Sequence, residues 1–487
     1  MLTNGRTALP CLSALVAARH DSAAQRCREP ACLVLVRGVT ATVLVAGLAA
    51  CSIFPYERGT RANEPFEAQA AATRGSERIS FAELAEPKVF IGIAMSGGGS
   101  RAANFSAAAL LELDRLGLLK HATAISSVSG GSLAAAYYGL YGADRQRWNE
   151  SRIKDVMRTD LQTNWGWRWL LPQNIVRYWF TPFDRSDIMK GVIDDELFGG
   201  RMVPYAAMNN ATRLPRILIN ASDITGGNFV FTDEAFRERL KARLDTYPVA
   251  HAVMASAAFP GGFNNVTLEN YTSVERRSYL HLIDGGPTDN LGVKVLRRTL
   301  ANIDGSEDAR PLRGCMMIVV DAYADLSATT QEHIAAHDKR YEDDPRAALD
   351  FLFDTNLNDA FDDLLSNHRE EMLKFMGYRE DRLGVRSFWT YRPFRDLERS
   401  VNRSLECHVW HLTFQTLARI EPDAKGEKSL SETVNGIRTL LKLRGAGEGD
   451  ANKLQQALFS AAHMLVSQDV AALNEALRLM QDWGISR

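Results

Sequence analysis

The sequence lacks the patterns that mark several large classes of protein. No Cys-x-x-Cys pair occurs among its six cysteines, which argues against the common zinc and thiol-redox motifs. No strongly basic region stands out, because 57 Lys and Arg residues balance 59 Asp and Glu residues, so a nucleic-acid-binding domain is not expected. There is no internal repeat and no low-complexity tract. What is left is a 487-residue chain with the composition of an ordinary globular enzyme.

The apolar run over residues 37–51 is too short to span a membrane. Arg37 precedes roughly a dozen apolar or small residues, which is the length of a signal-peptide core. Its end, Leu-Ala-Ala-Cys51, resembles a bacterial lipobox, which implies cleavage before Cys51 and lipidation of the thiol. A transmembrane anchor or a buried helix is the alternative. Because the segment before Arg37 is long, the true start is expected near residue 34.

The rest of the chain divides by composition. Residues 52–86 are polar and mixed and are predicted to be a flexible tether. We expect a catalytic core over 87–325 with an aromatic insertion at 160–200, then a helical C-terminal extension over 326–487 with a late strand at 405–416. A bridge between Cys315, in an apolar run, and Cys407 is left open by the sequence.

Strands and helices alternate at the start of the core. Apolar runs at 88–95 and 122–129 are predicted strands, and each is followed by residues at helical spacing. This order indicates a parallel βαβ unit and an α/β fold with a mainly parallel sheet. Further strands are expected at 216–223 with a hairpin partner, at 278–284, at 315–323, and at 407–414, the last at an edge.

A glycine-rich turn, "SGGGSR", follows the first strand. Such a turn before a helix can hold a nucleoside triphosphate, a dinucleotide, or the oxyanion of an acyl-transfer intermediate. No Gly-Lys-Ser/Thr follows, which argues against the triphosphate. The second strand ends in serines rather than in the acidic residue that a dinucleotide site needs. We therefore expect the N–H groups of Gly97, Gly98 and Gly99, with Ser100 and Arg101 beside them, to form an oxyanion hole. Arg101 could instead make a surface ion pair.

The second strand ends in a second small-residue turn. Ser127-Val-Ser129-Gly130-Gly131 resembles the nucleophile elbow Gly-x-Ser-x-Gly, with Ser127 in place of the first glycine. Ser129 would then lie at a helix N-terminus, where the helix dipole favours a developing alkoxide. The alternative is that Ser129 only caps the helix. Because both turns leave the same end of a parallel sheet, the two are expected to face each other.

Asp284 is the candidate base. It ends an apolar strand and is followed by Gly285 and Gly286, so its carboxylate lies beside a bare backbone. A carboxylate held within reach of a serine hydroxyl can accept its proton, and partial desolvation would raise its pKa. An ordinary turn aspartate is the alternative. The ten histidines offer no spacing that suits a serine–histidine pair.

Five ordered blocks resemble the patatin-like phospholipases. They are "SGGGSR", "SVSGG", "ASDITGGNFVF" (221–231), "ASAAFPGGF" (255–263) and "DGG", and together they span roughly residues 88–300. The resemblance implies a three-layer α/β/α fold, a Ser129–Asp284 dyad, an oxyanion loop at Gly97–Gly99, and lipid acyl hydrolysis without metal or organic cofactor. Ala102 and Ser127 stand where the family often has glycine, and both are small.

The predicted function is therefore that of a lipid acyl hydrolase, of phospholipase A, lysophospholipase or esterase type. An acyltransferase on the same dyad, or a non-catalytic envelope protein that binds lipid or a partner, is the alternative. The expected partners are an acyl-ester substrate and a membrane, reached through the lipid anchor and the aromatic insertion; no nucleic acid is expected. In that insertion Trp165, Trp167, Trp169 and Trp179 alternate with arginines, which suits a membrane interface, a lid, or a packed subdomain. The expected location is the bacterial cell envelope, at the outer membrane facing the periplasm.

Overall fold

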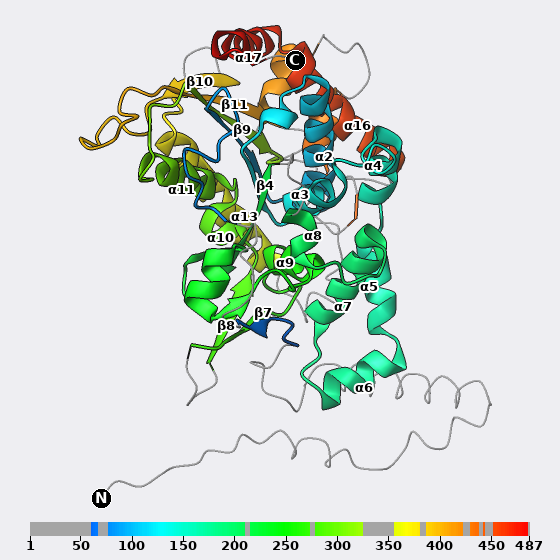
Figure 1. Ribbon diagram of the computed structural model, residues 1–487. Coiled ribbons are helices and arrows are strands. Elements are labelled where there is room, and N and C mark those ends of the chain that lie inside the picture. The colour runs from blue at the N-terminus through cyan, green and yellow to red at the C-terminus, as the bar shows by residue number, and fades with distance from the viewer. Residues whose placement is uncertain are drawn as a thin grey trace, which may run out of the picture.

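The computed structural model describes residues 60–66, 76–209, 215–272, 278–324, 355–379, 386–421, 429–437, 442–443 and 451–485. Its centre is a nine-stranded sheet in the order β10-β11-β9-β2-β3-β4-β8-β7, with β5 paired to β4 (Figure 1). The five strands from β11 to β4 are parallel, and the remaining pairs are antiparallel. The strands are β2 (Val89–Met95), β3 (Ala124–Val128), β4 (Arg216–Asp223), β5 (Asn228–Val230), β7 (Val266–Asn270), β8 (Ser278–Ile283), β9 (Gly314–Asp321), β10 (Phe388–Tyr391) and β11 (Cys407–Thr413).

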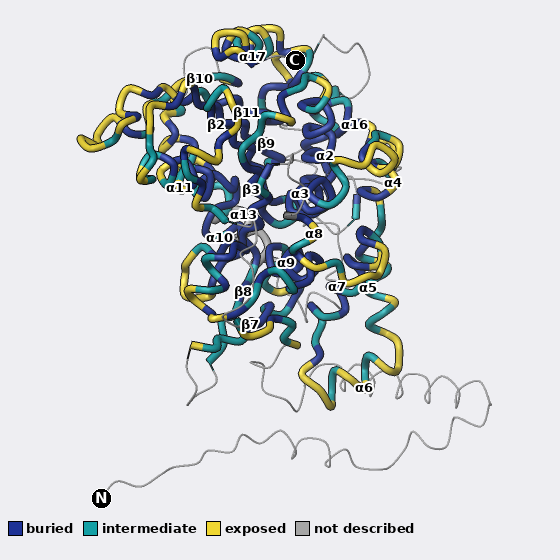
Figure 2. The backbone as a smooth tube through the Cα atoms, viewed as in Figure 1, coloured by how far each residue is buried: buried dark blue, intermediate teal, exposed yellow. Residues whose placement is uncertain are grey.

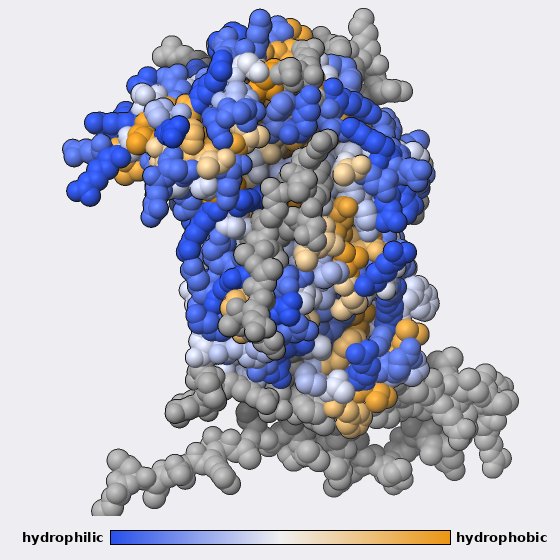
Figure 3. All heavy atoms as spheres, viewed as in Figure 1, coloured by the Kyte–Doolittle hydropathy of each residue, from blue (hydrophilic) through white to orange (hydrophobic). Residues whose placement is uncertain are grey.

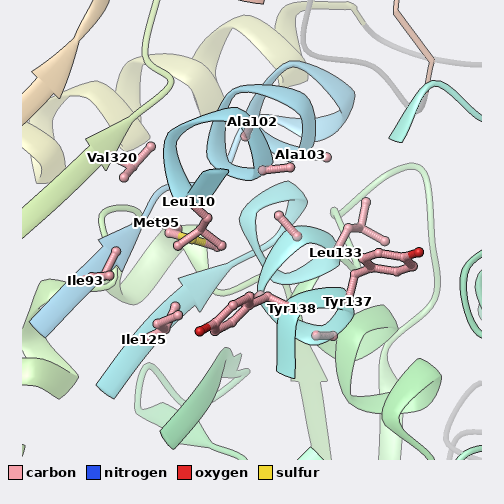
Figure 4. Close-up of a cluster of buried hydrophobic side chains, with 14 of the residues drawn as sticks. Ile93, Met95, Ala102, Ala103, Leu110, Ile125, Leu133, Tyr137, Tyr138 and Val320 are labelled. Atoms are coloured by element: carbon pink, nitrogen blue, oxygen red, sulfur yellow. The ribbon is translucent and has the colours of Figure 1, made fainter. Parts of the chain in front are cut away.

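Helices cover both faces of the sheet and make three layers. Alternate residues of β2 show how: Ile91 and Ile93 pack into one apolar core, while Phe90 and Ala94 pack into the other. The first core lies under α2 (Gly99–Arg115), α3 (Gly130–Tyr141), α16 (Ala451–His463) and α17 (Val470–Trp483), and Figure 4 shows part of it. The second lies under α11 (Val293–Asp304) and α13 (Thr355–Phe375). The predicted α/β class with a mainly parallel sheet and flanking helices is confirmed.

Shorter elements surround these layers. A two-stranded sheet pairs β1 (Glu64–Pro65) with β6 (Ala242–Arg243). The other elements are η1 (Leu119–His121), α4 (Glu150–Met157), α5 (Leu161–Trp169), α6 (Pro172–Phe180), α7 (Arg185–Ile193), η2 (Asp194–Phe198), α8 (Tyr205–Asn209), η3 (Ala235–Leu240), α9 (Val249–Ser256), α10 (Gly286–Asp289), η5 (Phe414–Thr416), α14 (Leu417–Ile420), α15 (Leu430–Asn435) and η6 (Met464–Gln468). Figure 2 shows that the sheet is buried and that α6 is among the most exposed elements.

The C-terminal strands complete the central sheet. The expectation that residues 407–414 form an edge strand is wrong, because β11 pairs in parallel with β9 and the edge is taken by β10. Cys315 and Cys407 are register neighbours on β9 and β11, and they form a disulfide. The bridge that the sequence left open is therefore present, because parallel pairing brings together two cysteines 92 residues apart.

Several expectations concern residues outside the described part of the chain. These are the signal peptide over 1–51, the lipidation site Cys51, residues 52–59 and 67–75 of the tether, and residues 326–354 of the helical C-terminal extension. No helix in the described ranges is both long and apolar enough to cross a bilayer.

Candidate active site

Ser129 sits in a sharp turn between β3 and α3. Its φ of 48° lies in the left-handed region that residues with a side chain rarely adopt, and it is the residue before the first turn of α3. Its N–H donates to the Ser256 hydroxyl at 2.9 Å, and its side chain accepts no hydrogen bond from the first turn of α3. The alternative that Ser129 only caps the helix therefore fails, since no cap hydrogen bond is made.

The elbow touches the glycine-rich loop backbone to backbone. A Cβ on Gly130 would lie 2.0 Å from the Gly99 carbonyl oxygen, so any side chain at this position would clash with the backbone of the loop. The small residues in both turns are thus required by close approach of two chains, as expected for loops that leave the same end of a parallel sheet. Gly131 follows the same logic, because its Cβ would lie 2.7 Å from the Ser96 carbonyl oxygen.

Asp284 lies directly beyond β8 and is 4% exposed. Burial raises the pKa of its carboxyl to about 6, while hydrogen bonding from the Gly286 N–H and from the Ser129 hydroxyl lowers it. The Gly286 N–H donates to Oδ1 at 2.8 Å. Gly285 allows the turn to pass close to β4, since a Cβ there would lie 2.6 Å from the Asn220 carbonyl oxygen. The structure therefore brings Ser129 and Asp284 together.

The glycine-rich loop begins α2. The Gly97 N–H donates to the Asn290 carbonyl oxygen at 3.0 Å, so it is already engaged. The N–H groups of Gly98 and Gly99 have no acceptor among the residues that the structure describes. They belong to the first turn of α2, whose dipole is positive at this end. Two N–H groups are thus available to an anion beside Ser129.

Asn290 is a site residue that the sequence analysis missed. Asn290 is 8% exposed. Its Oδ1 lies so close to Gly97 that a Cβ added to that glycine would be only 2.5 Å from it. The Ser129 Cβ lies 3.4 Å from the same position, so the carboxamide and the serine face one glycine. None of the described side chains hydrogen-bonds this carboxamide. The sequence shows only that Asn290 follows Asp284 by six residues, and this spacing does not by itself indicate a role in the site.

A buried hydroxyl network supports the elbow from behind. Ser256, the last residue of α9, donates to the Asn220 carbonyl oxygen at 2.5 Å and contacts the Ser132 hydroxyl at 2.9 Å. Ser132 in turn donates to the Ser127 hydroxyl at 3.0 Å. Ser127 is therefore a buried hydrogen-bond partner as well as a small residue. Ser256 lies in the block "ASAAFPGGF", so the block was visible in the sequence although the role of its serine was not.

Ser100 and Arg101 lie in the first turn of α2 and are both buried. Arg101 donates to the Ile437 carbonyl oxygen at 2.7 Å. This contact ties the start of α2 to the C-terminal part of the chain. The alternative of a surface ion pair for Arg101 is wrong, because its side chain is buried and contacts this carbonyl group.

A cluster of three buried charged or titratable side chains lies at the end of β9, next to β2 and the glycine-rich loop that follows it. Asp321 accepts from Arg369 Nε at 2.6 Å and contacts His411 Nε2 at 2.9 Å, and all three side chains are buried. Burial would raise the pKa of Asp321, but Arg369 and His411 outweigh it and hold the pKa well below its usual range. The cluster fastens α13 to the sheet edge that carries the site. In the described ranges, no group of three or more His, Cys, Asp or Glu side chains is arranged to hold a metal ion.

Residues 93–297 match the family model of the patatin-like phospholipases. Over these residues the chain resembles this family in sequence. The match contains both turns described above and the strand end that carries Asp284. No curated protein matches the chain in sequence.

Solved structures show a distant likeness to this chain. Human GIVD cytosolic phospholipase A2 is 13% identical with a TM-score of 0.43, and the match covers 83% of this chain and 61% of that one. Its complex with methyl gamma-linolenyl fluorophosphonate is 14% identical with a TM-score of 0.43, covering 81% and 60%. VipD from Legionella pneumophila is 11% identical with a TM-score of 0.29, covering 86% and 72%. The chain thus spans about three fifths of the length of the human enzyme.

Proposed function

We propose that the protein is a lipid acyl hydrolase of phospholipase A, lysophospholipase or esterase type, with Ser129 as nucleophile and Asp284 as base. The observation that carries the proposal is a serine in a left-handed turn whose hydroxyl meets a buried carboxyl group with a pKa of about 6. A pKa near 6 leaves this carboxylate ionised at neutral pH yet far more basic than an exposed aspartate. The resemblance to the patatin-like phospholipases supports serine-based ester chemistry.

The reaction we propose has two steps. In the first, Ser129 Oγ attacks the acyl carbonyl carbon while its proton passes to Asp284, and the resulting oxyanion accepts hydrogen bonds from the loop. The ester C–O bond then breaks, and Asp284 returns the proton to the departing alcohol, which leaves an acyl group on Ser129. In the second, Asp284 takes a proton from water, whose oxygen attacks the acyl carbon. The fatty acid departs and Ser129 regains its proton.

The loop N–H groups of Gly98 and Gly99 are the proposed oxyanion donors. Each such donor typically contributes about 3 kcal/mol to the transition state of acyl transfer. Gly97 has a different role in this proposal, because its N–H is engaged by Asn290. That bond is made by the backbone carbonyl of Asn290, and the carboxamide of Asn290 packs against Gly97 as well. Asn290 is therefore proposed as a positioning residue that joins the oxyanion loop to the strand end that carries Asp284.

We also propose that the protein is a lipoprotein of the bacterial cell envelope, anchored through Cys51 and facing the periplasm. The Cys315–Cys407 disulfide supports this location, because disulfides persist in oxidising compartments and are rare in the cytosol. Replacement of Cys51 by serine is expected to move the protein from the membrane fraction to the soluble fraction. Retention in the membrane fraction would show that the acyl anchor is not what holds it.

Mass spectrometry of lipid products tests the activity. Cells or vesicles exposed to the wild type should accumulate free fatty acid and lysophospholipid, whereas Ser129→Ala protein should leave the lipids unchanged. Ser151→Ala is the matched control, because Ser151 is exposed on α4 and is not among the residues of the candidate site. An acylated acceptor without free fatty acid would instead identify an acyltransferase. Identical lipids with wild type and Ser129→Ala would contradict any enzymatic role.

A further inference from the structure

Large apolar side chains are exposed at one end of the molecule. Of the eleven large hydrophobic residues that are exposed in the described ranges, five lie within residues 167–180, at the end of α5 and along α6. No residue of α6 is buried. In Figure 1, α6 projects beyond the body of the fold, and in Figure 3 hydrophobic side chains reach the surface in this region. The members of this α5–α6 surface are Trp167 (69% exposed), Leu170 (63%), Leu171 (41%), Val176 (55%) and Phe180 (64%).

The exposed residues lie close together along the chain. Val176 and Phe180 are four positions apart in α6 and therefore lie on one side of it. Leu170 and Leu171 form the connection between Trp167 at the end of α5 and the start of α6. An apolar face of this kind on a soluble body usually marks a contact with a membrane or another protein. The α5–α6 surface is therefore an apolar patch rather than a set of isolated exposed side chains.

Other aromatic residues of the same segment point inward and hold the surface in place. Trp165 packs edge-on against Phe263 at 5.4 Å between ring centroids, and its Nε1 donates to the Arg185 carbonyl oxygen at 3.0 Å. Asn174 of α6 donates to the Arg168 carbonyl oxygen of α5 at 2.7 Å. The two helices are thus fastened to each other and to the body, while Trp167 and Phe180 face outward.

The charged residues of α5 and α6 indicate which kind of surface the patch can bind. No Asp or Glu occurs in residues 161–183, whereas Arg168 and Arg177 do. Arg168 is paired with Asp195 at 2.6 Å, while the exposed Arg177 stacks over the Phe183 ring at 3.9 Å beside the apolar residues. Exposed tryptophan and phenylalanine next to arginine match the boundary between the acyl chains and the headgroups of an anionic bilayer.

We propose that the α5–α6 surface docks onto an anionic phospholipid bilayer and orients the protein on it. The choice of a bilayer over another partner rests on the proposed lipid substrate. The docking surface is linked to the site by short contacts: Trp165 packs on Phe263, and Phe263 follows α9, whose Ser256 binds the Ser129 N–H. Docking therefore places the rigid part of the fold that carries the site at the lipid surface.

The test measures binding of the full chain to vesicles of phosphatidylcholine with one third phosphatidylglycerol. Every variant carries Ser129→Ala so that lipid turnover cannot change the vesicles, and Cys51→Ser so that no acyl anchor contributes. Trp167→Ala and Phe180→Ala are each expected to weaken binding about tenfold, because each removes most of a buried aromatic side chain's transfer energy. The double substitution should weaken binding about a hundredfold. Leu397→Ala and Val470→Ala remove comparably exposed side chains elsewhere and should leave binding unchanged.

Hydrogen exchange gives a local readout that the N-terminal segment does not affect. Amides of residues 167–180 should exchange more slowly when the protein is bound to vesicles. Unchanged exchange there in bound protein, or equal binding of the double variant and the wild type, would overturn the proposal. Equal binding to pure phosphatidylcholine would overturn its anionic part. Hydrolysis of a short soluble ester by Trp167→Ala/Phe180→Ala protein with Ser129 intact should match the wild type, so a failure of the proposed activity is recognised separately.

Discussion

The substitution Asp284→Asn is expected to stabilise the fold while it abolishes hydrolysis. Burial raises the pKa of Asp284 from an ordinary 3.8 to about 6, a shift of about 2 units. Between these two pH values the folded protein binds the proton and the unfolded chain releases it, so the free energy of unfolding falls as the pH rises. Above pH 6 the cost reaches about 3 kcal/mol, since one unit corresponds to about 1.4 kcal/mol.

Asparagine removes this cost because it is neutral at every pH. It also keeps a carbonyl oxygen for the Gly286 N–H, which donates to Asp284 Oδ1 at 2.8 Å. The variant should therefore melt a few degrees above the wild type at pH 8 and at nearly the same temperature at pH 4. Asp289, whose pKa burial also raises to about 6, is present in both proteins and cancels in the difference.

The assay is thermal unfolding of both proteins from pH 4 to pH 8, with ester hydrolysis measured in parallel. Wild-type kcat/KM should fall tenfold per pH unit below about pH 6, because a protonated Asp284 cannot accept the serine proton. Asp396→Asn is the matched control, since the side chain of Asp396 is 85% exposed. A melting-temperature difference that does not vary with pH would refute the reasoning, because the carboxylate would then not be charged at a cost in the folded protein.

Three further substitutions probe the same site. Ser129→Ala should keep the melting temperature and lower ester hydrolysis by about 10⁴-fold or more, with no labelling by a fluorophosphonate; persistent labelling would assign the nucleophile elsewhere. Gly130→Ala should lower both stability, by about 1–3 kcal/mol, and kcat, because its Cβ would lie 2.0 Å from the Gly99 carbonyl oxygen. Asn290→Ala should lower kcat about tenfold with little change in KM, and should slow fluorophosphonate labelling to the same extent, because the loop loses the carboxamide that packs against Gly97 although the bond from the Gly97 N–H to the backbone carbonyl of residue 290 is kept. A change confined to KM would contradict that positioning role.

The sequence by itself determined the two turns and the strand end that make up the site, because the steric constraints that mark them are local. Three consecutive glycines, the Ser-Gly-Gly turn and the Asp-Gly-Gly strand end each mark a place where backbone must approach backbone, and the structure shows those approaches at Gly130 and Gly285. The alternation of strand and helix likewise predicted a parallel sheet, since short crossovers allow little else. The aromatic insertion was also visible, as a run of tryptophans and arginines.

Tertiary structure alone decided the features that depend on pairing between distant segments. The Cys315–Cys407 bridge and the inner position of β11 follow from strand order, which no local pattern encodes. Asn290 and Ser256 gain their places only when loops from different strands converge on Ser129. The tertiary structure also decided which aromatic side chains of the insertion are buried. Trp165 packs against Phe263, about a hundred residues away in sequence, whereas Trp167 is exposed to solvent. Burial and pairing are properties of the whole chain in space, and so they lie beyond the reach of spacing and composition.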